Sequence, residues 1–202
     1  TNDNVVLRLA AREAPVFGDR VLRLLGQARD RMAARYEAVL PDRVVVELFS
    51  DQKDFAVRTF GMPENPGFLG VCFGRVVTAN SPASHPGRPS NWEAVLWHEV
   101  AHVITLQMTK NKMPRWLSEG ISVYEESLAN PAWGQHMNPQ YREMILEGAL
   151  APVGQLSAAF LAPKTGRHLQ FAYYQSFLVV EFLVERYGFD RLKAVLRDLG
   201  EG

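Results

Sequence analysis

His98, Glu99 and His102 form the pattern His-Glu-Val-Ala-His inside a segment of helical periodicity. Residues four apart lie on one face of an α-helix, about 5–6 Å apart at Cβ, so both imidazoles can reach one metal ion. Glu99 is rotated by about 100° from His98, which lets it flank the metal and act on a bound water instead of ligating. The alternative is a buried helix whose two histidines hydrogen-bond to the backbone or to each other.

A metal site built on two histidines needs a third protein ligand and leaves a fourth position open for water or substrate. Sixteen residues separate His102 from Glu119, which stands in the segment Trp-Leu-Ser-Glu-Gly. A turn followed by an antiparallel helix can bring Glu119 back to the histidines over that length. The competing interpretation is an ordinary glutamate in the first turn of a helix, where it complements the helix dipole.

The remaining metal-binding or nucleophilic side chains are few. Cys72 is the only cysteine, which excludes an intramolecular disulfide and a cysteine-only metal site. We interpret it as a small buried residue rather than a nucleophile or a ligand. His85 and His136 stand in segments rich in proline and glycine, and we expect both at the surface.

The composition is that of an ordinary globular protein and excludes several classes. Lys+Arg and Asp+Glu number 22 each, so the chain lacks the basic excess of a nucleic-acid-binding protein. Hydrophobic residues make up 47%, enough to offset the ordering entropy of folding. No apolar run approaches the roughly 20 residues that a membrane-spanning helix needs.

The chain of 202 residues has the length of one domain. We expect an N-terminal lobe over about 1–109 and a helical lobe over about 110–202. The chain starts at Thr1 with no visible signal peptide, which favours a mature form or a piece of a longer protein. If a leader has been removed, an extracytoplasmic location is compatible with the sequence, whereas the oligomeric state is not indicated.

The elements that must position these residues follow from periodicity and breaker residues. The first half alternates strands with helices, and the second half is helical, which indicates an α+β fold with a small sheet. Ser90 and Glu93 form a capping-box pattern that starts the histidine-bearing helix. Strands are expected at 4–9, 43–49 and 68–79, and helices at 15–36, 51–60, 90–108, 115–129, 169–187 and 189–199.

The histidine pattern, followed by Pro-Arg-Trp-Leu-Ser-Glu-Gly-Ile-Ser-Val-Tyr-Glu-Glu, resembles the gluzincin metallopeptidases and, more closely, the peptidase MA-like domains over about residues 40–190. The resemblance implies a zincin-like fold and one zinc ion per chain, held by His98, His102 and Glu119. It also implies that Glu99 is the general base that deprotonates the zinc-bound water, so that the chain hydrolyses a peptide or protein substrate.

The resemblance further suggests residues around the substrate. Tyr173 is expected to stabilise the oxyanion, with His168 second, also as a substrate-binding residue, and Tyr174 third. The alternative for Tyr173 is an aromatic ring packed between helices. The segment 76–80 is expected to be either an edge strand that pairs with the substrate, with Asn80 hydrogen-bonding a substrate amide, or an ordinary interior strand.

Two further interpretations concern specificity and catalysis. The Gly-Ala-Met-Glu-Asn strand of gluzincin exopeptidases is absent, which favours an endopeptidase or a peptidase of narrow specificity. Ser122 or, preferably, Glu126 could orient a ligating histidine through its second ring nitrogen. The alternative function is a non-catalytic module of the same fold that binds zinc and a protein partner.

Overall fold

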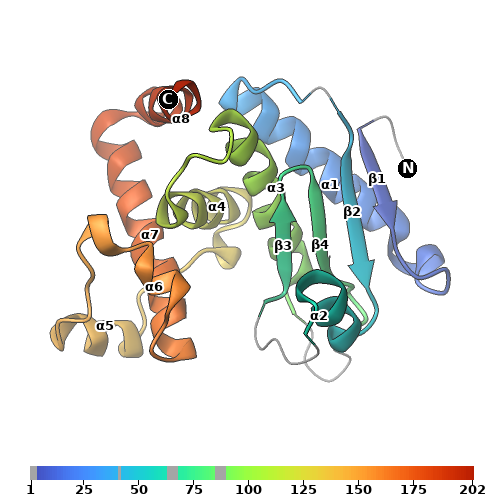
Figure 1. Cartoon of the computed structure of the whole chain (residues 1–202), viewed down its shortest axis with the longest axis horizontal. Helices are drawn as coiled ribbons and strands as arrows, with labels where there is room; N and C mark the ends of the chain where they lie inside the picture. Colours follow the sequence, from blue (N-terminus) through green and yellow to red (C-terminus); the bar gives the residue numbers. More distant parts are fainter. Residues whose placement is uncertain (1–3, 41, 63–67, 85–89) are drawn as a thin grey trace. The chain divides into compact units, whose positions relative to one another are not determined.

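The computed structural model describes residues 4–40, 42–62, 68–84 and 90–202, so the predicted surface histidine His85 lies outside the described residues. The chain forms two compact units, Thr1–Met108 and Thr109–Gly202. Strands and helices alternate in the first unit, whereas the second unit is helical (Figure 1). The predicted α+β class is confirmed. Among the described residues, no helix combines the length and the apolar character needed to cross a membrane.

The first unit is built on a four-stranded sheet in the order β1-β2-β4-β3. β1 pairs with β2 and β2 with β4 in parallel, and β3 pairs with β4 in antiparallel. The predicted single strand over 68–79 is wrong, because Gly74 and Arg75 divide it into a hairpin. Gly74 adopts a φ of 69°, which suits glycine at the first position of a tight two-residue turn. The strands are β1 Val5–Arg8, β2 Val44–Phe49, β3 Gly70–Phe73 and β4 Val76–Asn80.

The sheet order decides between the two interpretations of residues 76–80. β4 lies between β2 and β3, so the edge-strand expectation is wrong and the interior-strand alternative is confirmed. Val77, Thr78 and Ala79 are all buried, as the middle of a sheet requires. The edge next to β4 is instead formed by β3.

Three helices complete the first unit: α1 Ala14–Tyr36, α2 Gln52–Phe60 and α3 Trp92–Met108. α1 buries one stripe at helical spacing, which includes Val21, Leu25, Ala28 and Met32. α3 differs, since its buried residues are spread around nearly the whole helix. Polar side chains on α3 are therefore held among apolar neighbours.

The second unit contains five α-helices in the described chain: α4 Arg115–Ala129, α5 Pro139–Leu146, α6 Ala158–Leu161, α7 Gly166–Tyr187 and α8 Phe189–Glu201. α4 has the limits that the sequence predicts. The sequence predicts no helix between residues 129 and 169, whereas the structure has α5 and α6 there, together with the 3-10 helices Pro131–Trp133 and Val153–Gln155. Part of the hydrophobic core of the second unit is an aromatic cluster that includes Tyr141, Phe171 and Tyr174.

α4 and α7 pack closely at Gly120. A Cβ atom added to Gly120 would lie 2.5 Å from the carbonyl oxygen of Ser176 and 2.9 Å from Val180 Cγ2. The first of these atoms is helix backbone, which cannot rotate aside. Glycine at this position therefore allows the close approach of the two helices.

We expect Gly120→Ala to lower the free energy of unfolding by about 1–3 kcal/mol, because the added methyl group forces α4 and α7 apart. This loss would outweigh the roughly 1 kcal/mol that alanine gains over glycine in helix propensity. Chemical denaturation measures the change. Gly154→Ala is the matched control, since nothing lies within 4 Å of a Cβ added there. An unchanged midpoint for Gly120→Ala would contradict the packing argument.

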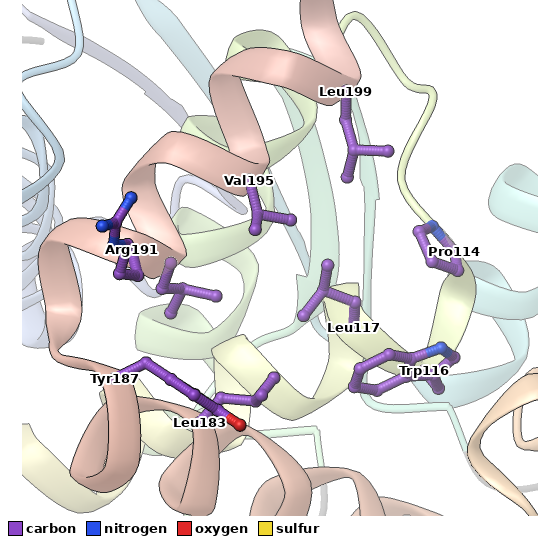
Figure 2. A pocket seen from close by; sticks show the side chains of 9 residues that line it. Pro114, Trp116, Leu117, Leu183, Tyr187, Arg191, Val195 and Leu199 are labelled. Atoms are coloured by element: carbon purple, nitrogen blue, oxygen red, sulfur yellow. The ribbon is translucent and has the colours of Figure 1, made fainter.

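A pocket of about 450 Å³ opens in the second unit. Its walls come from the start of α4, the end of α7 and from α8 (Figure 2). The lining is mainly apolar and contains none of the residues that the sequence predicts for chemistry. The lining residues are Pro114, Trp116, Leu117, Leu183, Tyr187, Arg191, Leu192, Val195 and Leu199.

Candidate metal centre

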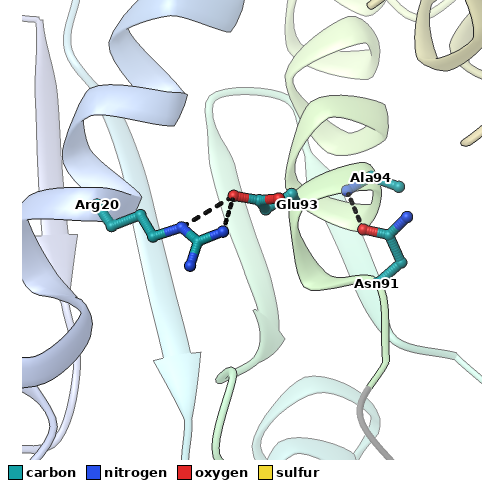
Figure 3. A network of polar contacts seen from close by, with 4 residues as sticks. All are labelled: Arg20, Asn91, Glu93 and Ala94. Atoms are coloured by element: carbon teal, nitrogen blue, oxygen red, sulfur yellow. Dashed lines mark hydrogen bonds and ion pairs between the residues drawn. The ribbon is translucent and has the colours of Figure 1, made fainter. Parts of the chain in front are cut away.

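Contacts at the start of α3 fix the helix that carries the histidines (Figure 3). Arg20 of α1 donates two hydrogen bonds to Glu93 Oε1, at 3.0 Å from Nε and 2.8 Å from Nη2. Asn91 Oδ1 accepts from the backbone N–H of Ala94 at 3.3 Å. The predicted capping box of Ser90 and Glu93 is therefore wrong: the helix begins after Asn91, and Glu93 serves to join α3 to α1.

His98 and His102 lie on successive turns of α3. Their ring centroids are 4.7 Å apart with the planes inclined by 79°, and one nitrogen of each ring lies within 4.8 Å of one on the other. Zinc–nitrogen bonds of about 2.0–2.1 Å in a tetrahedral site would bring the two nitrogens to roughly 3.3 Å, within reach of small side-chain rotations. His102 is only 8% exposed, so a bound ion would be largely shielded on that side.

Glu99 is 5% exposed and turns toward the edge strand β3. A Cβ added to Gly70 of β3 would lie 2.8 Å from Glu99 Oε1, which shows how closely strand and carboxylate approach. The same charge also acts on Cys72, two residues further along β3. The carboxylate that the sequence predicts as general base therefore lies against the strand at the sheet edge.

Cys72 is partly buried, and its Sγ donates a hydrogen bond to the carbonyl oxygen of Gly74 at 3.1 Å. Burial raises the pKa of the thiol well above its usual range, and the negative charge of Glu99 raises it further. Both effects disfavour the thiolate, which is the reactive form of cysteine. The result agrees with the interpretation of Cys72 as a residue that is not a nucleophile.

We expect Glu99→Gln to lower the pKa of Cys72, because the substitution removes the negative charge that opposes the thiolate. The pKa should stay above its usual range, since burial is the larger cause. Alkylation by iodoacetamide as a function of pH measures the shift, and the signal is unambiguous because the chain holds one cysteine. Glu93→Gln on the same helix should leave the profile unchanged. If Glu99→Gln also left it unchanged, the carboxylate would not lie beside the thiol.

Glu119 lies one turn into α4 and is only 1% exposed. Its Oε1 accepts from Arg115 Nε at 2.7 Å, and Arg115 itself is half-exposed. The interpretation of Glu119 as an ordinary glutamate of the first turn is wrong, because the residue is buried and lies beyond that turn. A buried carboxylate requires positively charged or hydrogen-bonding partners, and Arg115 supplies one of them.

The residues predicted around the oxyanion have packing or capping contacts in the second unit. The ring of Tyr173 packs edge-on against Phe160 with centroids 5.0 Å apart. Tyr174 stacks on Tyr141 at 4.7 Å. His168 Nδ1 lies 2.9 Å from Oγ1 of Thr165, the residue that caps α7. The ring contact with Phe160 supports the packing alternative for Tyr173. The catalytic role of Tyr173 and the substrate role of His168 stay predictions.

Asn80 donates two hydrogen bonds to residues of the first unit. Its side-chain amide donates to Gln52 Oε1, and its backbone N–H donates to the carbonyl oxygen of Leu69 at 2.9 Å. Because β4 is an interior strand, the substrate contact predicted for Asn80 loses its structural basis.

His136 lies at the surface as expected, with Nε2 2.9 Å from the carbonyl oxygen of Pro131.

Sequence reasoning missed two residues. Glu125 on α4 is 1% exposed, whereas the favoured Glu126 is partly exposed. The stripe of Leu117 and Ile121 at four-residue spacing could have indicated that Glu125 is buried. Gly70 lies within the strand expected over 68–79, and no local pattern reveals its approach to Glu99.

The chain has an α+β fold, and α3 carries two neighbouring imidazoles together with the buried Glu99. These are the features of a metallopeptidase-like protein. The chain belongs to the Peptidase MA superfamily, whose family model matches residues 88–202. This match includes the histidine pair, Glu99 and Glu119. No match was found among curated proteins or among solved structures.

Proposed function

We propose that the protein is a zinc-dependent peptidase in which His98, His102 and Glu119 hold one zinc ion. The observation that carries the proposal is the imidazole pair on successive turns of α3, with ring centroids 4.7 Å apart, together with the burial of Glu99 on the same helix. Only residues 109–114 separate α3 from α4 along the chain. The burial of Glu119 supports a role inside the protein rather than at its surface.

The donor set fits zinc in type and number. Two imidazoles and one carboxylate form the His₂Glu combination of catalytic zinc sites, which keeps a fourth position open. Zinc at these residues would polarise the scissile carbonyl and lower the pKa of the attacking water toward ~7. Metal-ion dependence is also the usual property of this superfamily, as the resemblance implies.

Glu99 is the proposed general base. Its carboxylate accepts the proton of the attacking water and then transfers it to the leaving amine, so the proton ends on the new amino group. Tyr173, whose side chain is only partly buried, is the proposed donor to the oxyanion. The carboxylate lies against β3, which restricts its position before substrate binds.

The proposed substrate contact is on β3 rather than on residues 76–80, because those residues form the interior strand β4. β3 is the edge strand, so an extended peptide could add to the sheet beside it through backbone hydrogen bonds. Strand addition recognises the peptide backbone and does not require a chain end. We therefore propose an endopeptidase.

The test is a zinc measurement on the whole chain together with digestion of a mixed peptide library, read by mass spectrometry. We expect one zinc per chain, cleavage that stops with 1,10-phenanthroline, and recovery when zinc is restored. Bound zinc without cleavage would favour the alternative of a non-catalytic module that binds zinc and a partner. Absence of both would overturn the proposal.

A further inference from the structure

Gly70 begins the edge strand β3 and directly faces α3. A Cβ atom added there would lie 2.8 Å from Glu99 Oε1, 2.9 Å from Glu99 Cγ and 3.0 Å from Val95 Cγ1. These separations are shorter than normal contacts between carbon and its neighbours. No side chain larger than hydrogen fits at this position while Glu99 keeps its place.

The surroundings determine which group would move. Gly70 pairs with Ala79 of β4, and Ala79 is fully buried, so the strand has little room to retreat. Two of the three nearest atoms are Oε1 and Cγ of Glu99, and both move when that side chain rotates about its Cα–Cβ bond. The least costly response to a methyl group at Gly70 is therefore a rotation of the Glu99 side chain away from β3.

We propose that Gly70 is a positioning residue, which fixes the carboxylate of Glu99 by bringing bare strand backbone against it. The inference rests on the proposed function, since a fixed carboxylate matters there as the general base. A side chain at Gly70 would leave His98 and His102 in place and displace only the base. A displacement of about 1 Å in such a group can cost about 100-fold in rate.

The test compares Gly70→Ala with the wild-type chain on one peptide that the library experiment identifies as cleaved. We expect kcat to fall by about 100-fold, with KM, zinc content and Tm close to the wild-type values. Gly18→Ala is the matched control, because this α1 glycine of the same unit has nothing within 4 Å of an added Cβ. Unchanged kcat, or a loss explained by lower zinc content or Tm, would overturn the inference.

A second measurement needs no substrate. Gly70 and Cys72 point to the same face of β3, so moving the Glu99 carboxylate away from the strand also moves it away from the thiol. We expect the difference in Cys72 pKa between the wild-type chain and E99Q to become smaller when both also carry G70A. Iodoacetamide alkylation across pH measures all four proteins.

The two measurements separate the inference from the proposed function. If the wild-type chain cleaves no peptide but G70A reduces the difference in Cys72 pKa, the positioning by Gly70 holds and the peptidase proposal fails. If the chain is a peptidase but G70A changes neither kcat nor the difference in pKa, the inference alone is wrong.

Discussion

The Glu99→Gln variant is expected to bind zinc like the wild-type chain and to hydrolyse peptides about 100- to 10,000-fold more slowly, the range typical of a lost general base. Glutamine has nearly the same shape as glutamate but cannot accept the proton of the attacking water. The substitution leaves both imidazoles of α3 unchanged, so metal binding should persist. Metal analysis tests the expected zinc binding. The value of kcat on a peptide from the library tests the expected loss of hydrolysis.

The matched control for this variant is Glu93→Gln. Glu93 lies on the same helix but binds Arg20 of α1, and this ion pair is partly solvent-accessible. Its loss should cost no more than about 1 kcal/mol of stability and leave kcat unchanged. A fully active Glu99→Gln chain would show that another group accepts the proton.

Glu119→Ala should reduce zinc affinity by more than the roughly 10- to 100-fold that loss of an outer hydrogen-bond partner costs, because it removes a ligand itself. The two remaining imidazoles are neutral and leave the ion without its only proposed anionic ligand. Competition with a chromogenic chelator measures the affinity. Peptide cleavage should fall at the same time when zinc is limiting.

Loss of Glu119 must be separated from damage to the fold. The substitution removes an ion pair with Arg115, which is half-exposed and can be solvated. Because Glu119 is also buried, some loss of Tm is expected, and Tm in the presence of chelator measures it against the wild-type value under the same conditions. Glu143→Ala, at an exposed glutamate of the same unit, is the control. Zinc affinity equal to the wild type in Glu119→Ala would exclude Glu119 as a ligand.

Local patterns predicted the longer helices of this chain well but not the short helices α5 and α6. The limits of α4 follow from Pro114 before the helix and from apolar residues at helical spacing, and both signals lie within the segment. His98 and His102 likewise lie on one face of α3 simply because they are four residues apart in one helix. These features require no knowledge of the rest of the chain.

Features that depend on distant pairing were not predictable in the same way. Gly74 is compatible with both a bulge and a turn, so the hairpin of β3 and β4 looked like one strand. The place of β4 between β2 and β3 depends on which strands pair, and no local pattern specifies that choice. The substrate contact predicted for Asn80 assumed that its strand lies at the edge of the sheet, so it depended on the same strand order.

Glu119 and Gly120 are neighbours in sequence but are constrained for different reasons. In a deep mutational scan selected for peptidase activity, we expect both positions to tolerate almost no substitution. A scan selected only for cellular abundance should keep the full intolerance at Gly120, because any side chain there meets the backbone of α7, and should relax it at Glu119 for side chains that fit the buried position. Intolerance at Gly120 would then reflect the spacing of two helices and would persist in relatives that have lost catalysis.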